Sequence, residues 1–304
     1  MLALLFATSL ALAADPPKDA PKDPAAPPPK AVKLFDGEST FGWDTTGNVN
    51  VLEGKLVLGS NSGASFKCPL PAGKVVMTYD DGKTVESDNK AGDRLNMGVG
   101  KSAVTLKSVT FTPAGLKPLF NGKDLTGWSI LKDEKRMLSA AEVTKEGELH
   151  LTNGPGDLQS AGKYADFVLQ LECKTNGDGL NSGVFFRCID GQYQNGYELQ
   201  ISNAALDTDP TKPKDFGSGA IYRRIAARKI VAKDKEWMTL TLVAKGATFA
   251  TWVNGEPVVV WADDRAKDEN PRKGLRLEAG HLSLQGHDKT TDLLFRGIQI
   301  AEIK

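Results

Sequence analysis

The sequence predicts an all-β protein, an antiparallel sandwich or jelly roll preceded by a smaller β unit. Apolar and polar residues alternate in short segments such as 166–174, 197–201 and 238–244, which is typical of half-buried strands. Asn254-Gly255 stands between two apolar runs, and this pair favours the positive φ angles of a two-residue hairpin turn. Many short strands joined by Gly-rich turns favour a sandwich over other β folds. The segment 220–233 could pass for a helix, but we expect a loop with at most one short helical turn.

The N-terminal segment shows no strand pattern. Residues 1–14 form an apolar run that ends in small residues, which is typical of a secretory signal peptide and too short to span a bilayer. Residues 15–32 are mostly Pro, Ala, Lys and Asp without an aromatic residue, so we expect an extended linker. These features predict an exported protein, periplasmic or extracellular, without a transmembrane span.

A sequence motif occurs twice in the chain. KLFDGESTFGW and PLFNGKDLTGW share Leu, Phe, two Gly and Trp at matching places. Three pairs of segments match in the same order: 33–43 with 118–128, 53–58 with 146–151, and 106–111 with 294–300. The earlier copy therefore has the beginning and the end of the later copy but lacks its middle.

We accordingly divide the chain after the linker into a first β unit, residues 33–113, and a second β unit, residues 115–304. Trp43 and Trp128 end the shared motif, and we expect both to pack in the core rather than stack on a sugar. The first β unit lacks the middle segments that carry the candidate site. We therefore expect it to have a supporting or docking role.

Charge and cysteine content narrow the class of protein. Of the 304 residues, 38 are Lys or Arg and 38 are Asp or Glu, so the net charge is zero and nucleic acid is not an expected partner. Three cysteines do not make a disulfide framework. A Cys173–Cys188 disulfide is possible in an exported protein, but we favour buried thiols. Residues 177–183 resemble part of a calcium loop without its full ligand set, so we favour a hairpin loop there.

Strand alternation selects the first candidate site residues. In GYELQIS the apolar residues share one face, so Glu198 and Gln200 point to the other. The same reasoning places Phe185 and Arg187 of GVFFRC outward, together with Gln285 of HLSLQGHDK. If these strands are neighbours in one curved sheet, its open face displays an aromatic ring, a cation, a carboxylate and amides. Such a set suits a sugar.

Three more candidates lie beside these strands. His287 follows the last of them, Arg296 lies on the next strand, and Tyr222 lies in the Gly-rich loop GSGAIYRR. Each candidate taken alone could be a solvated surface residue, because exposed polar side chains on sandwich faces are common. Their convergence in one pocket is therefore the decisive expectation. His150 is expected on a surface strand, and Asp157 in a loop with no role.

An ordered set of motifs indicates a family. The opening motif, NSGVFFR, GYELQIS, GSGAIY, WVNGEPV and the closing LSLQGH…FRGIQI together resemble the bacterial 3-keto-disaccharide hydrolase family, domain of unknown function 1080. The resemblance covers essentially all of the second β unit and part of the first. It implies a concanavalin A-like two-sheet jelly roll and cleavage of glycosides that carry a ketone at C3. Gln285 and His287 match a Gln and a His that recur in the closing segment of the family.

This resemblance leads to an enzymatic hypothesis. A C3 ketone acidifies the proton at C2, so a modest base, Glu198 or His287, could remove it and expel the substituent at C1. Arg187, or a divalent cation held by Glu198 and its neighbours, would stabilise the enolate oxygen. The expected substrate-binding residues are Phe185, Gln200, Tyr222, Gln285 and Arg296. The alternative is a non-catalytic carbohydrate-binding module in which Phe185 or a tryptophan stacks on a sugar ring.

Overall fold

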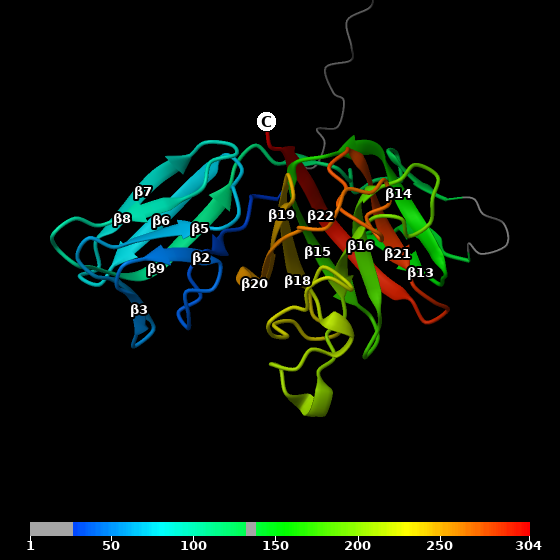
Figure 1. Ribbon diagram of the computed structural model, residues 1–304. Coiled ribbons are helices and arrows are strands. Elements are labelled where there is room, and N and C mark those ends of the chain that lie inside the picture. The colour runs from blue at the N-terminus through cyan, green and yellow to red at the C-terminus, as the bar shows by residue number, and fades with distance from the viewer. Residues whose placement is uncertain (1–26, 132–137) are drawn as a thin grey trace, which may run out of the picture.

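The computed structural model describes residues 27–131 and 138–304 (Figure 1). The predicted signal peptide and the larger part of the predicted linker lie outside the described residues. The described elements are antiparallel strands and two short 3-10 helices, η1 (Leu206–Thr208) and η2 (Lys214–Phe216). No helix in the described ranges has the length and apolar character needed to cross a membrane. The predicted all-β class is confirmed.

Two facing sheets build the second β unit. The larger sheet has the order β12-β13-β22-β15-β18-β19-β20, with β10 paired to β22, and the smaller has the order β11-β14-β21-β16-β17. The larger sheet comprises β10 (Lys117–Pro118), β12 (Ala140–Val143), β13 (Leu149–Thr152), β15 (Phe167–Thr175), β18 (Met238–Lys245), β19 (Thr248–Val253), β20 (Glu256–Ala262) and β22 (Asp292–Glu302). The smaller comprises β11 (Trp128–Ile130), β14 (Gly156–Tyr164), β16 (Ser182–Cys188), β17 (Tyr197–Ile201) and β21 (Gly280–Gly286). This is the predicted jelly-roll sandwich.

The first β unit repeats part of this design. Its larger sheet has the order β3-β4-β9-β6-β7 with β1 paired to β9, and a second sheet has the order β2-β5-β8. The strands are β1 (Val32–Lys33), β2 (Trp43–Thr46), β3 (Val49–Leu52), β4 (Lys55–Leu58), β5 (Gly63–Phe66), β6 (Gly73–Tyr79), β7 (Thr84–Asn89), β8 (Asn96–Gly98) and β9 (Val104–Pro113). The order β3-β4-β9-β6-β7 parallels β12-β13-β22-β15-β18. In this parallel, β16, β17, β19 and β20 of the second β unit have no counterpart.

The repeated opening motif is structural in both units, as predicted. Trp43 and Trp128 are both buried, at 4% and 7% exposure. Their indole N–H groups donate to the carbonyls of Leu34 and Leu119, at 2.7 and 3.0 Å. Each ring thereby fills its own core while its polar atom is satisfied.

Central strands of the larger sheet are buried on both faces. Along β15, Leu169 and Leu171 pack into the sandwich core, whereas Val168 packs into the core of the first β unit. Trp252 of β19 does the same, and its indole N–H donates to the carbonyl of Lys33 at 2.7 Å. The first β unit therefore covers the outer face of this sheet, beside β19 and β20 (Figure 1).

The end of the predicted linker is bound rather than free. The backbone of Lys30 exchanges two hydrogen bonds with the side-chain amide of Gln170, at 2.7 and 2.8 Å, and Val32 already belongs to β1. Residues 30–32 therefore differ from the expected tether. Gln170 on the outer face of β15 supplies the donor and acceptor that hold them.

Three predictions of local structure are confirmed and one is wrong. Asn254-Gly255 joins β19 to β20 with positive φ at both residues, and residues 220–233 form no helix, both as predicted. All three cysteines are buried free thiols. The expectation of a hairpin at 177–183 is wrong, because this segment passes from β15 in one sheet to β16 in the other.

Candidate active site

A pocket of about 530 Å³ lies over the outer face of the five-stranded sheet. The floor comes from β17 and β21, and the walls come from the loops around residues 193, 222 and 272. The lining residues in the described chain are Asn181, Tyr193, Gln194, Asn195, Glu198, Tyr222, Arg223, Arg272, Gln285 and His287. The structure therefore brings four of the predicted site residues together: Glu198, Tyr222, Gln285 and His287.

Glu198 is the carboxylate of this pocket. It lies on β17, paired with Phe185 of β16, and is only 4% exposed. A Cβ at Gly183 would lie 2.7 Å from its Oε1, so the glycine of the NSGVFFR segment leaves the room that this side chain occupies. Strand alternation predicted this position correctly.

Burial makes Glu198 suitable for proton transfer. Desolvation raises its pKa to about 7, against the opposing charge of Arg272 and with help from the negative charges of Asp157 and Asp215. A carboxyl that titrates near neutral pH can both accept and donate a proton.

Arg272 is the cation of the pocket, and sequence reasoning missed it. Its guanidinium donates to Glu198 at 3.2 Å and to the carbonyl of Gln194 at 2.8 Å. It also lies over the ring of Phe185, 5.1 Å from the ring centroid. Arg272 belongs to the irregular segment between β20 and β21, where no strand pattern could have given its direction.

Asp157 supplies a second buried carboxyl close to the pocket. It lies on β14 paired with Gln285, not in the loop where it was expected. One carboxylate oxygen accepts the backbone N–H of Gln194 at 3.0 Å. Burial raises its pKa to about 7, although this hydrogen bond and Arg272 act in the opposite direction. Alternation around the apolar Leu158 of GDLQS could have predicted its outward position.

The closing segment places an amide and an imidazole at the pocket. The Oε1 atom of Gln285 is buried and has no hydrogen-bond partner among the described residues, so it is an acceptor that a ligand hydroxyl could satisfy. His287 is more exposed, at 40% of its side chain, and its Nδ1 lies 2.9 Å from the carboxylate of Asp288. When Nδ1 donates this hydrogen bond, the neutral ring keeps Nε2 as a proton acceptor.

Tyr222 lies beside the free edge of β17, and Gln200 lies on β17 itself. Tyr222 lines the pocket, and its backbone N–H donates to the carbonyl of Glu198 at 2.9 Å. Gln200 is fully buried beside the pocket rather than in its lining. Its amide N–H groups donate to Asn181 and Asp215, which makes it a support for Asn181.

The prediction that Arg187 faces the same hollow is wrong. Residue 187 has a φ of 52°, and the pairing of β16 with β21 shifts between Phe185 and Cys188. This bulge breaks the alternation on which the prediction depended. The guanidinium is completely buried on the other side, where it donates to the carbonyls of Ala165 and Arg276, both at 2.8 Å, and pairs with Asp166 at 3.1 Å.

Two other expected positions also differ. Arg296 lies on β22 of the larger sheet, where it pairs with Glu172 at 2.7 Å and stacks 4.0 Å from the centroid of Trp237. It is not part of the pocket. Phe185 does share the face of Glu198, but it is fully buried and Arg272 covers its ring, so it offers no surface for a sugar.

The described side chains offer few ligands for a bound cation. Residues 27–131 and 138–304 contain no group of three His, Cys, Asp or Glu residues placed to hold a metal ion. Glu198 and His287 are the residues of these types that line the pocket. We therefore derive no chemical step through a metal.

Comparison with solved structures identifies a protein with the same fold. A candidate glycosyl hydrolase from Parabacteroides distasonis ATCC 8503 has a TM-score of 0.50 at 20% identity, over 62% of this chain and 94% of its own, which shows the shared fold. A second candidate glycosyl hydrolase from the same organism has 25% identity and a TM-score of 0.49, over 62% and 99% of the two chains. The carbohydrate-binding module CBM66 from Bacillus subtilis has 16% identity and a TM-score of 0.42, over 58% and 96%. No curated protein sequence matches the chain.

The family profile of the 3-keto-alpha-glucoside-1,2-lyase-like domain matches residues 115–301. This span is nearly the whole second β unit and contains every residue that lines the pocket. Because it also exceeds half of the 304 residues, the chain belongs to the family of the 3-keto-alpha-glucoside-1,2-lyase-like domain.

Proposed function

We propose that the protein is an exported enzyme that cleaves 3-keto-glycosides by base-assisted elimination, with net hydrolysis when water then adds to the product. The observation that carries this proposal is the pairing of Glu198 with Arg272 in one pocket. A buried carboxyl with a pKa of about 7 is a suitable base for a proton next to a ketone. The adjacent guanidinium is a suitable partner for the oxyanion that forms.

The elimination assigns a role to each of these groups. Glu198 takes the proton from C2, and the electron pair of that C–H bond moves toward C3, whose oxygen becomes an enolate beside Arg272. The enolate then restores the ketone and forms a C1–C2 double bond as the bond from C1 to the leaving oxygen breaks. The leaving oxygen takes a proton from Nε2 of His287 at the pocket rim, which enters this step as the imidazolium and leaves it as the neutral ring. His287 as the base, with Glu198 as the acid, is the reverse assignment.

The rest of the pocket suits the recognition of a small sugar. Its volume of about 530 Å³ is within the range of small-ligand sites. Gln285 offers its unsatisfied amide oxygen, Asn181 is held by Asp215, and Tyr222 presents an aromatic ring. Polar groups of this kind bind hydroxyls and orient C2 toward Glu198.

A test compares a 3-keto-disaccharide with its unoxidised parent, following substrate and products by mass. The wild type should consume only the oxidised substrate. Glu198→Gln should lower the rate by about 10²–10⁴-fold, the usual contribution of a general base. The matched control is Glu146→Gln, because Glu146 is exposed in the turn between β12 and β13.

The outcomes separate the two functional hypotheses. Full activity of Glu198→Gln would contradict the assigned role. Binding of the disaccharides without any turnover by the wild type would contradict the enzyme and favour a carbohydrate-binding module. A rate loss in His287→Ala, with a changed pH profile, would support the acid–base pair.

A further inference from the structure

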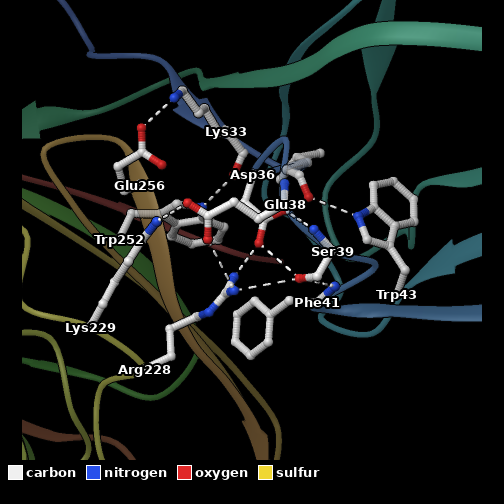
Figure 2. A network of polar contacts seen from close by, with 11 residues as sticks. Lys33, Asp36, Glu38, Ser39, Phe41, Trp43, Arg228, Lys229, Trp252 and Glu256 are labelled. Atoms are coloured by element: carbon white, nitrogen blue, oxygen red, sulfur yellow. Dashed lines mark hydrogen bonds and ion pairs between the residues drawn. The ribbon is translucent and has the colours of Figure 1, made fainter. Parts of the chain in front are cut away.

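One long segment contacts both the pocket and the first β unit. Residues 202–237 connect β17 to β18, and we call them the pocket loop. The loop carries Tyr222 and Arg223 into the pocket lining. Only a few residues later, Arg228 and Lys229 reach the first β unit (Figure 2).

Arg228 is held by the opening motif of the first β unit. Its guanidinium forms an ion pair with the carboxylate of Asp36, whose side chain is only 1% exposed. It also lies 4.5 Å from the ring centroid of Phe41. Lys229 adds a second ion pair with Glu38 at 2.7 Å. Figure 2 shows these groups converging between the two units.

Comparison of the two copies of the motif shows which contacts of Asp36 need its negative charge. In the first copy, Oδ1 of Asp36 accepts the backbone N–H groups of residues 38 and 39, both at 2.8 Å. In the second copy, Oδ1 of Asn121 accepts those of residues 123 and 124, at 2.8 and 3.0 Å. An asparagine therefore holds the same turn. The carboxylate of Asp36 makes two further contacts through Oδ2, which accepts the hydroxyl of Ser39 at 3.0 Å and pairs with the guanidinium of Arg228. Of these two, the contact with Arg228 is the one that joins two charges.

A continuous set of contacts leads from Arg228 to the pocket. The preceding residue, Ala227, donates its backbone N–H to the carbonyl of Phe216 at 2.9 Å. The ring of Phe216 packs against the ring of Tyr222, with centroids 5.1 Å apart. Tyr222 in turn donates its backbone N–H to the carbonyl of Glu198. The backbone of Arg228 is also fixed, because its N–H donates to the carbonyl of Val258 on β20 at 3.1 Å.

We propose that the first β unit positions the pocket loop: Asp36 and Phe41 hold Arg228, and this contact keeps Tyr222 in the pocket wall. Asp36 is thus a positioning residue that acts through Arg228. The positioning itself is independent of the proposed reaction, whereas its effect on turnover rests on the proposed function.

The test uses Asp36→Asn in the full chain, since the asparagine retains the turn and removes the charge. Hydrogen exchange of the Ala227 and Arg228 amides should become about tenfold faster, as expected for the loss of one charge-assisted hydrogen bond. Amides of β21, which pairs with β14 and β16 rather than with the pocket loop, should exchange as in the wild type. With a 3-keto-disaccharide, KM should rise about tenfold with a smaller change in kcat, because the wall that orients the substrate is affected rather than the base.

Two further variants test whether the effect depends on the contact between Asp36 and Arg228. Glu256→Gln breaks the ion pair between Glu256 and Lys33, another contact between the units that does not involve the pocket loop, and should leave the exchange of both amides unchanged. Arg228→Gln should reproduce the effect of Asp36→Asn, and the double variant should add little to either change.

Unchanged exchange in Asp36→Asn, or an equal effect of Glu256→Gln, would overturn the proposal. If the wild type showed no turnover, the proposed function would fail, and the exchange rates would still decide whether the loop is positioned in this way.

Discussion

Replacement of Glu198 by Gln should change how the stability of the protein depends on pH. In the folded protein, burial raises the pKa of Glu198 to about 7 from its ordinary value of 4.5. Between these values, the folded state keeps a proton that the unfolded state has released. The free energy of unfolding therefore falls as the pH rises from about 4.5 to about 7, and this contribution is level above that range.

The magnitude follows from the same two values. At about 1.4 kcal/mol for each pH unit, the interval from 4.5 to about 7 corresponds to about 3 kcal/mol. The glutamine side chain of the variant does not titrate, so the variant should lack this part of the slope. Relative to the wild type, the variant should gain up to about 3 kcal/mol between pH 4.5 and pH 8. Asp157 contributes a slope of the same sign, which the variant retains.

Urea unfolding followed by tryptophan fluorescence, at half-unit steps from pH 4.5 to pH 8, measures this difference. Glu146→Gln should follow the wild-type curve, because it removes an exposed carboxylate. Equal slopes for Glu198→Gln and the wild type would show that Glu198 ionises as an ordinary exposed carboxyl, and the argument for it as a base near neutral pH would fail.

The remaining predictions concern three other side chains. Arg272→Ala should lower kcat/KM for a 3-keto-disaccharide by about 10²–10³-fold, the usual loss for one group that stabilises an oxyanion, whereas Arg296→Ala outside the pocket should leave it unchanged in the same assay. Asp157→Asn removes a negative charge that raises the pKa of Glu198, so the rise of kcat/KM with pH should move to lower pH; an unmoved profile would show that the two carboxyls do not interact. Arg187→Met should lower the free energy of unfolding by about 2 kcal/mol or more, measured in urea, because it abolishes buried hydrogen bonds; a wild-type free energy would contradict the assigned structural role.

Alternation along the strands predicted the site where the strands are regular. Glu198 and Gln285 lie on regularly paired residues of β17 and β21, so their outward direction followed from their apolar neighbours. Arg187 lies in a bulge with positive φ, and one such residue reverses the direction of the side chain. The sequence contains no signal for this bulge, because Arg is not a residue that favours positive φ.

Positions set by irregular segments or by packing between units could not be predicted in the same way. Arg272 reaches Glu198 from a loop whose path depends on hydrogen bonds far apart in sequence, such as that to Gln194. In the sequence, alternation directs the apolar Val168 and Trp252 outward, away from the sandwich core. In the structure both pack into the core of the first β unit. Their apolar character is explained only by the first β unit, which covers them.

The charges around the pocket explain why one proton should remain there near neutral pH. Arg272 is hydrogen-bonded to Glu198, and its charge also stabilises the ionised form of Asp157. Arg272 balances one of these two carboxylates and Asp215 adds a further negative charge near Glu198, so ionisation of both carboxyls leaves an excess of negative charge, which is costly away from water. A single proton on either carboxyl reduces this excess. For the proposed elimination, this arrangement favours uptake of the C2 proton on Glu198 when Asp157 is already protonated, because the negative charge would then pass to the enolate beside Arg272 and the total charge of the site and its ligand would stay constant.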